Sequence, residues 1–142
     1  MIREFKPQDC KEVAKLELEC FSSPWSEVAI LESLNNNTTF FVFEENGRVQ
    51  GYAGLQIVLD EGYVTNIAVT KTARGRGIGQ SLVEALINLG TQKGLAFISL
   101  EVRQSNLPAV SLYTKCGFKN VGKRKNFYQN PTEDAVIMTK EF

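Results

Sequence analysis

The sequence predicts a mixed α/β fold, in which a central β-sheet of about seven strands carries four helices on its two faces. Three observations predict it. Segments rich in β-branched and aromatic residues alternate with segments whose apolar residues recur at helical spacing. Asn46-Gly47 lies between two strand-like segments, where it is a strong hairpin signal. A glycine-rich turn then joins a strand-like segment to an amphipathic helix.

The first half of the chain is predicted to hold four strands and two helices. Residues 2–5 form a short strand, and the apolar spacing that follows predicts a helix over 7–19. Ser26 can cap a second helix that runs to about Leu34. Three strands follow, at residues 39–44, 49–58 and 62–69.

The second half is predicted to add two helices and three strands. Apolar residues at helical spacing begin at Ile78, and Gly94 lies just beyond the end of that helix. Pro108 opens a shorter helix that stops at Gly117. The strands are expected at residues 97–103, 118–125 and 134–140. The predicted order is therefore β-α-α-β-β-β-α-β-α-β-β.

Length and charge limit the kinds of partner. The 142 residues suit a single domain over 1–142. Sixteen basic residues balance sixteen acidic ones, so net charge gives no general attraction to nucleic acid or to anionic membranes. The apolar runs are too short to span a bilayer, and the charged N-terminus does not resemble a secretion signal. We therefore expect a cytoplasmic protein that binds neither nucleic acid nor a membrane directly.

The chain contains no histidine. This excludes a Ser-His-Asp triad, a Cys-His pair and the His-Glu-x-x-His zinc site. Cys10, Cys20 and Cys116 are too widely spaced for a disulfide framework or a metal-ligand pattern, so no metal is expected. Cys116 stands at a predicted helix end, where the helix dipole disfavours a thiolate, and we interpret it as a packing residue. Proton transfer must then use carboxylate, tyrosine, lysine, cysteine, water or substrate.

The glycine-rich turn predicts an anion site. The first N–H groups of a helix lack intrahelical partners, and the helix dipole adds positive charge there. Interleaved arginines add donors. The spacing Gly-x-Gly-x-Gly, without a following lysine, differs from the P-loop and from the dinucleotide fingerprint. The alternative is that the glycines only shape a tight turn. The segment is Arg74-Gly75-Arg76-Gly77-Ile78-Gly79-Gln80.

These residues carry a specific resemblance. Arg74-x-x-Gly77-x-Gly79 is similar to the cofactor signature of the GNAT superfamily of N-acetyltransferases, and nearly the whole chain follows that family's element order. The resemblance is closer to the bacterial subgroup that acetylates the N-terminal alanine of ribosomal protein S18. The segments that carry it include Pro24-Trp25-Ser26-Glu27, Leu100-Glu101-Val102-Arg103 and Leu112-Tyr113.

The resemblance implies a GNAT fold and acetyl-CoA as co-substrate. It implies that the backbone of Ile67, Ala68 and Val69 meets the pantetheine arm and the thioester. Asn106 would reach the cofactor beside the sulfur. The pyrophosphate would be wrapped by Arg74, Gly75, Arg76, Gly77, Ile78, Gly79 and Gln80. The implied partner is a protein N-terminus, that of ribosomal protein S18, and the implied state is a monomer or a weak dimer.

Two residues are candidates for acid–base catalysis. Glu101 lies within an apolar strand, where partial burial would suit a base. The pattern alone favours a salt bridge from Glu101 to a nearby arginine, such as Arg103 or Arg74. Tyr113 can be a core aromatic or a neutral proton donor. The resemblance implies that Glu101 is the general base, directly or through water, and that Tyr113 protonates the leaving thiolate.

The acceptor is implied to lie between two loops, residues 21–27 and 126–133. Trp25 either forms a pocket wall or docks the two helices as an apolar plug. Tyr128 is a candidate contact for the peptide backbone. Relatives often carry two adjacent tyrosines here, and Phe127 stands in the first place.

Two other functions remain open from the sequence. One is acetylation of a small amine such as a polyamine or an aminoglycoside, for which acidic residues in the acceptor loops are few. The other is an acyl-CoA-binding module without catalysis, which the presence of both Glu101 and Tyr113 disfavours.

Overall fold

One seven-stranded sheet runs through the computed structural model, which describes all 142 residues. The strands are β1 (Ile2–Glu4), β2 (Thr38–Glu45), β3 (Arg48–Val58), β4 (Glu61–Val69), β5 (Phe97–Arg103), β6 (Lys119–Tyr128) and β7 (Glu133–Glu141). Their order in the sheet is β1-β2-β3-β4-β5-β7-β6. Only β4 and β5 pair in parallel, and all other neighbours are antiparallel.

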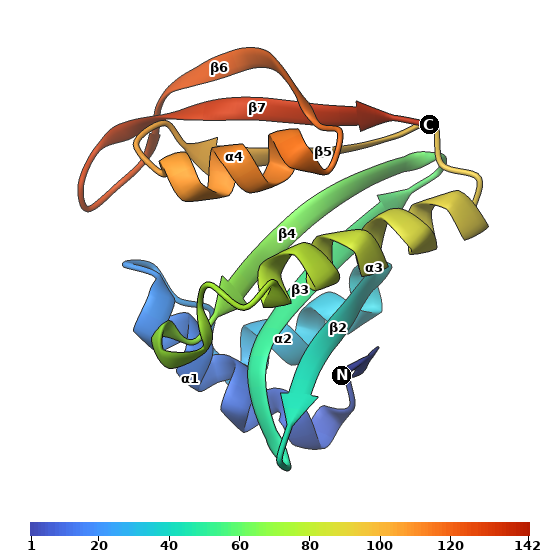
Figure 1. The fold of residues 1–142 in the computed structure, drawn as a ribbon, viewed down its shortest axis with the longest axis vertical. Helices are drawn as coiled ribbons and strands as arrows, with labels where there is room; N and C mark the ends of the chain where they lie inside the picture. Colours follow the sequence, from blue (N-terminus) through green and yellow to red (C-terminus); the bar gives the residue numbers. More distant parts are fainter.

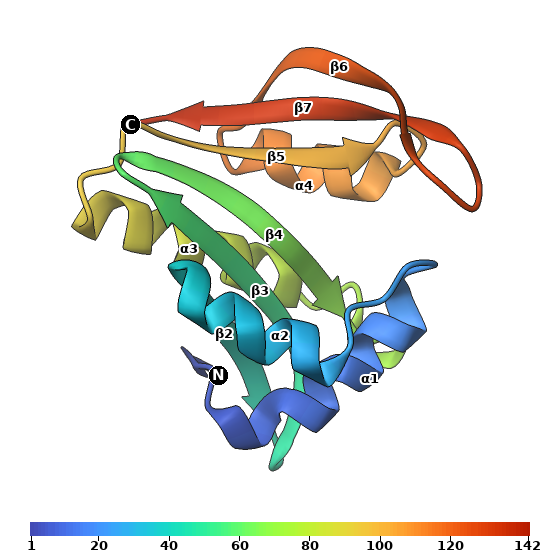
Figure 2. The same ribbon diagram turned by 180° about the vertical axis from the view of Figure 1, so that it is seen from behind.

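Helices cover both faces of this sheet, as predicted. They are α1 (Cys10–Cys20), α2 (Glu27–Ser33), α3 (Ile78–Gln92) and α4 (Leu107–Lys115), with short 3-10 turns at Pro7–Asp9, Leu34–Asn36 and Lys71–Ala73. Figures 1 and 2 show α3 and α4 on one face and α1 and α2 on the other. No helix combines the length and the apolar character needed to cross a membrane.

Two predicted boundaries were wrong. The first helix begins at Cys10 rather than at Pro7, because Pro7–Asp9 forms a 3-10 turn. The Asp9 carboxylate there accepts two 2.8 Å hydrogen bonds from the Arg3 guanidinium, which fix the turn against β1. The sixth strand extends beyond residue 125, because Tyr128 still pairs with Glu133 across the β6–β7 turn after a register shift.

Two apolar clusters hold the helices to the sheet. The larger one joins β5 and β7 to α3 and α4, through residues such as Leu86, Ile98 and Met138. The smaller one lies under α1, around Val13 and Phe40. Both are built from residues that are almost fully buried, so the sheet has a separate core on each face.

The sheet opens between β4 and β5. Their pairing covers only the segments from Glu61 to Tyr63 and from Phe97 to Ser99, after which the two strands diverge (Figures 1 and 2). β4 also carries a β-bulge, because Thr65 and Asn66 both lie opposite the single residue Gly54 of β3. The far half of β4 is therefore bound on one side only, which leaves an opening in the middle of the sheet.

Gly54 tests the packing of this bulge. A Cβ atom at Gly54 would overlap Thr65 Oγ1 and the Phe40 ring. We expect Gly54→Ala to lower the free energy of unfolding by about 1–3 kcal/mol, the usual cost of overpacking, as measured by urea denaturation. Gly122→Ala is the control, since its Cβ would meet nothing closer than 3.8 Å. Equal stability of the two variants would contradict the tight fit at the bulge.

Candidate active site

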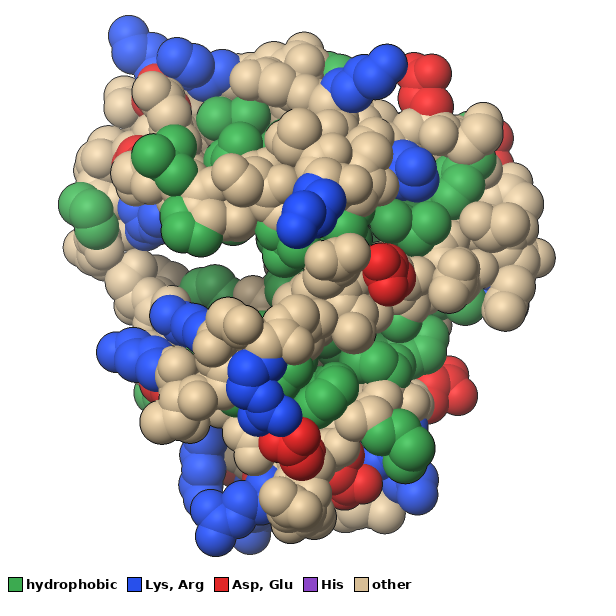
Figure 3. Space-filling model, viewed as in Figure 1, with side chains coloured by type: hydrophobic (Ala, Val, Ile, Leu, Met, Phe, Trp, Pro, Cys, Tyr) green, Lys and Arg blue, Asp and Glu red, His purple; other side chains and the backbone are tan.

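A cavity of about 550 Å³ fills the opening between β4 and β5. We call it the central cavity. Figure 3 shows the molecule hollowed between the half with β5–β7 and α4 and the half with β1–β4. Strands, α4 and two loops all contribute to its lining. The predicted site residues among the lining are Ile67, Val69, Gly79, Glu101, Asn106, Tyr113 and Tyr128.

Glu101 reaches the central cavity from β5. Burial alternates along this strand, and Glu101 lies on the face opposite Leu100 and Val102, as predicted. Its side chain is 31% exposed, and its Oε1 lies 3.3 Å from Arg124 Nε. The predicted ion-pair partners, Arg103 and Arg74, were wrong. Arg124 reaches Glu101 instead because β6 lies beside β7, which pairs with β5.

Tyr113 reaches the same cavity from α4, on the other face of β5. It is buried within the larger apolar cluster together with Leu100 and Val102. Burial, followed by the nearby Tyr128 and Cys116, raises the pKa of Tyr113 above its ordinary value. The phenol therefore keeps its proton at neutral pH. A carboxylate and a protonated phenol thus meet one cavity from two sides, which is an arrangement suited to base and acid roles.

The glycine-rich turn presents its backbone to solvent at the start of α3. No backbone N–H group from Gly75 to Gln80 donates a hydrogen bond within the protein, and no side chain caps the helix. Gly75 and Gly77 have φ values of 81° and 82°, which favour glycine, and a Cβ at either would meet no atom within 4 Å. The turn is therefore free to receive an anion.

The two arginines of the turn are already engaged. Arg74 Nε donates to the Val69 carbonyl at 3.0 Å, and its Nη2 lies 3.4 Å from Cys20 Sγ. Arg76 pairs with Glu45 at 2.5 Å. Neither lines the central cavity. Their positive charges lie beside the free N–H groups, but an anion would have to compete for the guanidinium donors.

The remaining predicted cofactor residues differ in whether their side chains line the cavity, pack in a core or bond a neighbour. Ile67 and Val69 line the cavity, whereas Ala68 between them points into the smaller apolar cluster. Ile78 is buried in the larger cluster, and Gln80 donates to Glu84 at 3.1 Å. Ala68 and Ile78 can therefore meet a cofactor only through their backbone, and the Gln80 side chain is directed along α3 toward Glu84.

Two helix contacts shape the cavity floor. Asn106 caps α4, and its side chain accepts a hydrogen bond from Ala109 N at 3.3 Å. Gly79 allows α3 to approach α4, because a Cβ there would already lie 3.2 Å from Leu112. Both residues thus position α4, and with it Tyr113, in addition to lining the cavity.

Arg103 closes the central cavity on the side opposite α4, where its guanidinium contacts two loops. Its guanidinium donates to the carbonyls of Gln129 and Pro131, both at 2.9 Å, and lies 3.3 Å from Glu133. It also lies 4.5 Å from the centre of the Tyr128 ring. Ser22, from the loop between α1 and α2, contacts both Arg103 and Gln129 at 3.5 Å. The two predicted acceptor loops therefore meet over the cavity.

Trp25 lies outside the central cavity. It packs partly buried against the smaller apolar cluster, and its backbone N–H donates to Glu17 Oε1 at 2.8 Å. This position favours the packing interpretation of Trp25 over a pocket wall. A contact between Trp25 and the acceptor remains a prediction.

Several lining residues were not anticipated from the sequence. They come from β4 and α4, and include Val64, Thr65, Asn66 and Ala109, whereas Phe21 and Ser23 belong to the predicted acceptor loop. The buried carboxyl group of Glu17 beneath Asn66 was also missed. Its position four residues after Val13 places it on the buried face of α1, and this spacing was the signal available in the sequence.

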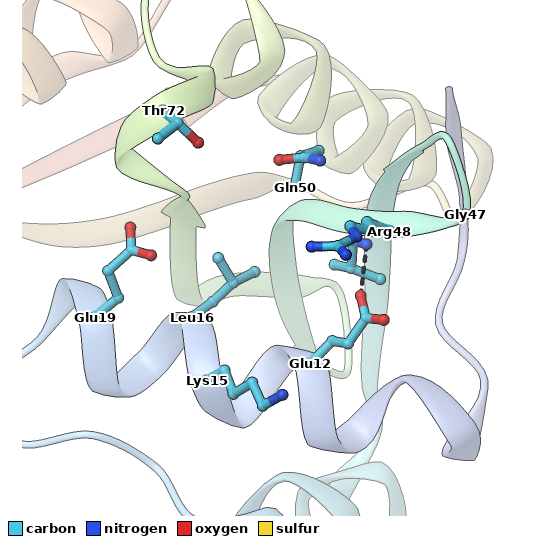
Figure 4. A pocket seen from close by; sticks show the side chains of 9 residues that line it. Glu12, Lys15, Leu16, Glu19, Gly47, Arg48, Gln50 and Thr72 are labelled. Carbon is cyan, nitrogen blue, oxygen red and sulfur yellow. Dashed lines mark hydrogen bonds between the residues drawn. The ribbon is translucent and has the colours of Figure 1, made fainter.

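A second cavity, of about 580 Å³, lies between α1 and the turn joining β2 to β3 (Figure 4). Its acidic groups already hold the backbone. Glu12 accepts from Val49 N at 2.6 Å, and Glu19 accepts from Lys71 N at 2.7 Å. No residue predicted for the site lines it. The central cavity is therefore the candidate active site.

Comparisons with known proteins agree with this geometry. The profile of the acetyltransferase (GNAT) family matches residues 10–118. The ribosomal protein bS18-alanine N-acetyltransferase of Escherichia coli (strain K12) is 34% identical over 96% of this chain and 94% of its own length. The crystal structure of the Escherichia coli ribosomal-protein-S18-alanine N-acetyltransferase superposes with a TM-score of 0.92 at 33% identity, over 99% of this chain and 92% of that one. Ard1 from Thermoplasma volcanium gives 0.91 at 26% identity, over 99% and 96%.

The chain belongs to the acetyltransferase (GNAT) family. As a GNAT protein it is an acetyl-CoA-dependent N-acetyltransferase. This assignment favours an enzyme over the alternative of an acyl-CoA-binding module without catalysis. The described residues fit this co-substrate. The free N–H groups from Gly75 to Gln80 suit a pyrophosphate, and the central cavity offers a path between β4 and β5 for a narrow acyl-carrying arm.

The protonation of Tyr113 in this GNAT site can be tested directly. Because burial raises its pKa, the phenol should stay neutral at pH values where free tyrosine, with a pKa of about 10, has ionised. We expect the alkaline absorbance titration of wild type minus Tyr113→Phe to show phenolate only above that range. Circular dichroism on the same samples confirms that the fold persists. Ionisation at or below a pKa of about 10 would contradict the buried environment.

Proposed function

We propose that the chain transfers the acetyl group of acetyl-CoA to a protein N-terminal α-amine, that of the N-terminal alanine of ribosomal protein S18. The Escherichia coli relative is named for that alanine and that protein. The observation that carries the proposal is the central cavity, which Glu101 and Tyr113 enter from opposite faces of β5. This arrangement lets an amine approach from one face and a thioester from the other.

Glu101 and Tyr113 divide the proton transfers. An ammonium group cannot attack a thioester, because its nitrogen lone pair holds a proton. Glu101 removes this proton, directly or through a water molecule, and the amine attacks the thioester carbonyl. The carbon–sulfur bond then breaks, and Tyr113 gives its proton to the departing thiolate. The attacking nitrogen loses its second proton as the amide forms, and a proton from solvent restores the Tyr113 phenol. Direct attack needs no covalent enzyme intermediate.

The glycine-rich turn holds the co-substrate in this proposal. The backbone N–H groups of residues 75–80 bind the pyrophosphate, with positive charge from Arg74 and Arg76 nearby. The backbone of residues 67–69 meets the pantetheine arm along the free edge of β4. Asn106 lies beside the sulfur, at the start of the helix that carries Tyr113.

The acceptor enters between the two loops that Arg103 joins. The Tyr128 ring is held by the Arg103 guanidinium, and burial followed by the nearby Glu101 raises the pKa of Tyr128 to about 12. Its hydroxyl therefore remains a donor for a peptide carbonyl. The loop around Phe21 lies opposite, and together they suit enclosure of a small first side chain. Phe127 can offer only apolar contact.

A mass assay tests the acceptor. The protein is incubated with acetyl-CoA and a peptide that carries the S18 N-terminus, and the expected product is the peptide with one acetyl group on its α-amine. A peptide with a blocked N-terminus is the control and should stay unchanged. Turnover of a polyamine without any peptide product would favour the small-amine alternative instead.

Substitutions test the two catalytic roles. We expect Glu101→Gln and Tyr113→Phe each to lower kcat by about 10²–10⁴-fold, because each removes one proton transfer, while acetyl-CoA still binds. Steady-state kinetics at saturating substrates measures the change. Tyr63→Phe is a matched control, because Tyr63 bonds Glu61 and lies outside the cavity. Near-normal rates in both active-site variants would remove these residues from the chemistry.

A further inference from the structure

A completely buried carboxyl group lies on α1, beneath the central cavity. Glu17 has no exposed surface and forms no ion pair. Three neutral donors satisfy it instead: Tyr52 Oη at 2.6 Å, Trp25 N at 2.8 Å and Asn66 Nδ2 at 3.1 Å. Burying such a group is unfavourable unless its hydrogen bonds are made, so this network is a costly feature of the core.

The three donors come from three separate segments. Trp25 belongs to the loop between α1 and α2, Tyr52 to β3 and Asn66 to the bulge of β4. Burial, followed by the adjacent Glu17, raises the pKa of Tyr52 far above its ordinary value, so its phenol remains a donor. Through these three hydrogen bonds, the Glu17 carboxylate connects α1 to the first acceptor loop, to β3 and to β4.

Asn66 links this network to the cavity. It lines the central cavity and precedes Ile67 in β4. Its Oδ1 has no hydrogen-bond partner although solvent does not reach it. A buried acceptor without a hydrogen bond is unfavourable, so stability alone would favour another residue in this place. The Asn66 amide bonds Glu17 through Nδ2 and leaves Oδ1 unpaired beside the cavity, which indicates a role in the site rather than in stability.

We propose that Glu17 is a positioning residue for acetyl transfer, acting through Asn66 to fix the β4 bulge beside Glu101 and Tyr113. The inference rests on the proposed catalytic pair. β4 has no β5 partner beyond Tyr63, so nothing on that side of the sheet restrains the bulge. The Glu17 contact supplies the missing restraint. A displacement of about 1 Å in reacting groups can lower a rate about 10²-fold, so loss of the contact affects kcat.

Two substitutions and their combination test the role. We expect Asn66→Ala and Glu17→Gln each to lower kcat about 10–100-fold, with KM for acetyl-CoA little changed. Because both act through one contact, the double variant should be no slower than the slower single variant. Asn66 is only partly buried and its replacement removes an orphaned acceptor, so Asn66→Ala tests the proposal even where Glu17→Gln folds poorly.

Two controls separate positioning from stability. Val13→Ala shortens another fully buried α1 side chain, which packs in the smaller apolar cluster and does not line the central cavity, so Tm should fall while kcat stays near wild type. Glu12→Gln alters the matched α1 residue that holds Val49 N outside the cavity, and should leave kcat unchanged.

Wild-type kcat in Asn66→Ala would overturn the inference, and so would rate losses that multiply in the double variant. Failure of the wild type to acetylate the peptide would instead overturn the proposed acceptor. The same variants can then be compared on whichever amine the wild type does acetylate, so the two failures are distinguishable.

Discussion

The divergence of β4 from β5 is the constraint on which the site depends. Parallel pairing ends at Tyr63 and Ser99, and beyond it the backbone groups on one edge of β4 have no strand to bond. Such an edge is unfavourable in a buried sheet, because its N–H and C=O groups need partners. In this protein the edge lines the central cavity, where an extended pantetheine arm can supply those partners. The same opening admits groups from both faces of the sheet.

The electrostatics of the site are local. The chain has no net formal charge, so attraction of an anionic co-substrate cannot come from the whole molecule. In the proposed function it comes from the free N–H groups and the dipole at the start of α3, with two arginines beside them. The adjacent helix, α4, is capped by Asn106, and its packing against Gly79 brings Tyr113 to the same cavity. In the proposed function, the packing of these two helices therefore couples co-substrate binding to proton donation.

Because the chain has no histidine, the proposed mechanism assigns proton transfer to a tyrosine and a glutamate whose surroundings differ. Tyr113 lies in an apolar cluster that keeps its proton in place. Glu101 lies on the opposite face of the same strand, partly exposed and beside Arg124. Arg103 lies two residues after Glu101 on the same face of β5. Its guanidinium donates hydrogen bonds to the second predicted acceptor loop instead of pairing with Glu101. One strand thus separates the proposed acid from the proposed base and connects the proposed base to the predicted acceptor loops.

The sequence by itself determined the elements and the chemistry. Periodicity predicted the strands and helices to within a few residues, and alternation placed Glu101 opposite Leu100, because these depend on local geometry. Glycine spacing located the turn whose N–H groups are free at the start of α3, and the anion bound there stays a prediction. Only the tertiary structure decided which distant residues meet. Arg124 reaches Glu101 through the order of β5, β7 and β6, and Trp25 turns toward the smaller core. Glu17, Tyr52 and Asn66 converge although 35 and 49 residues separate the latter two from Glu17, and no local pattern encodes a contact over such separations.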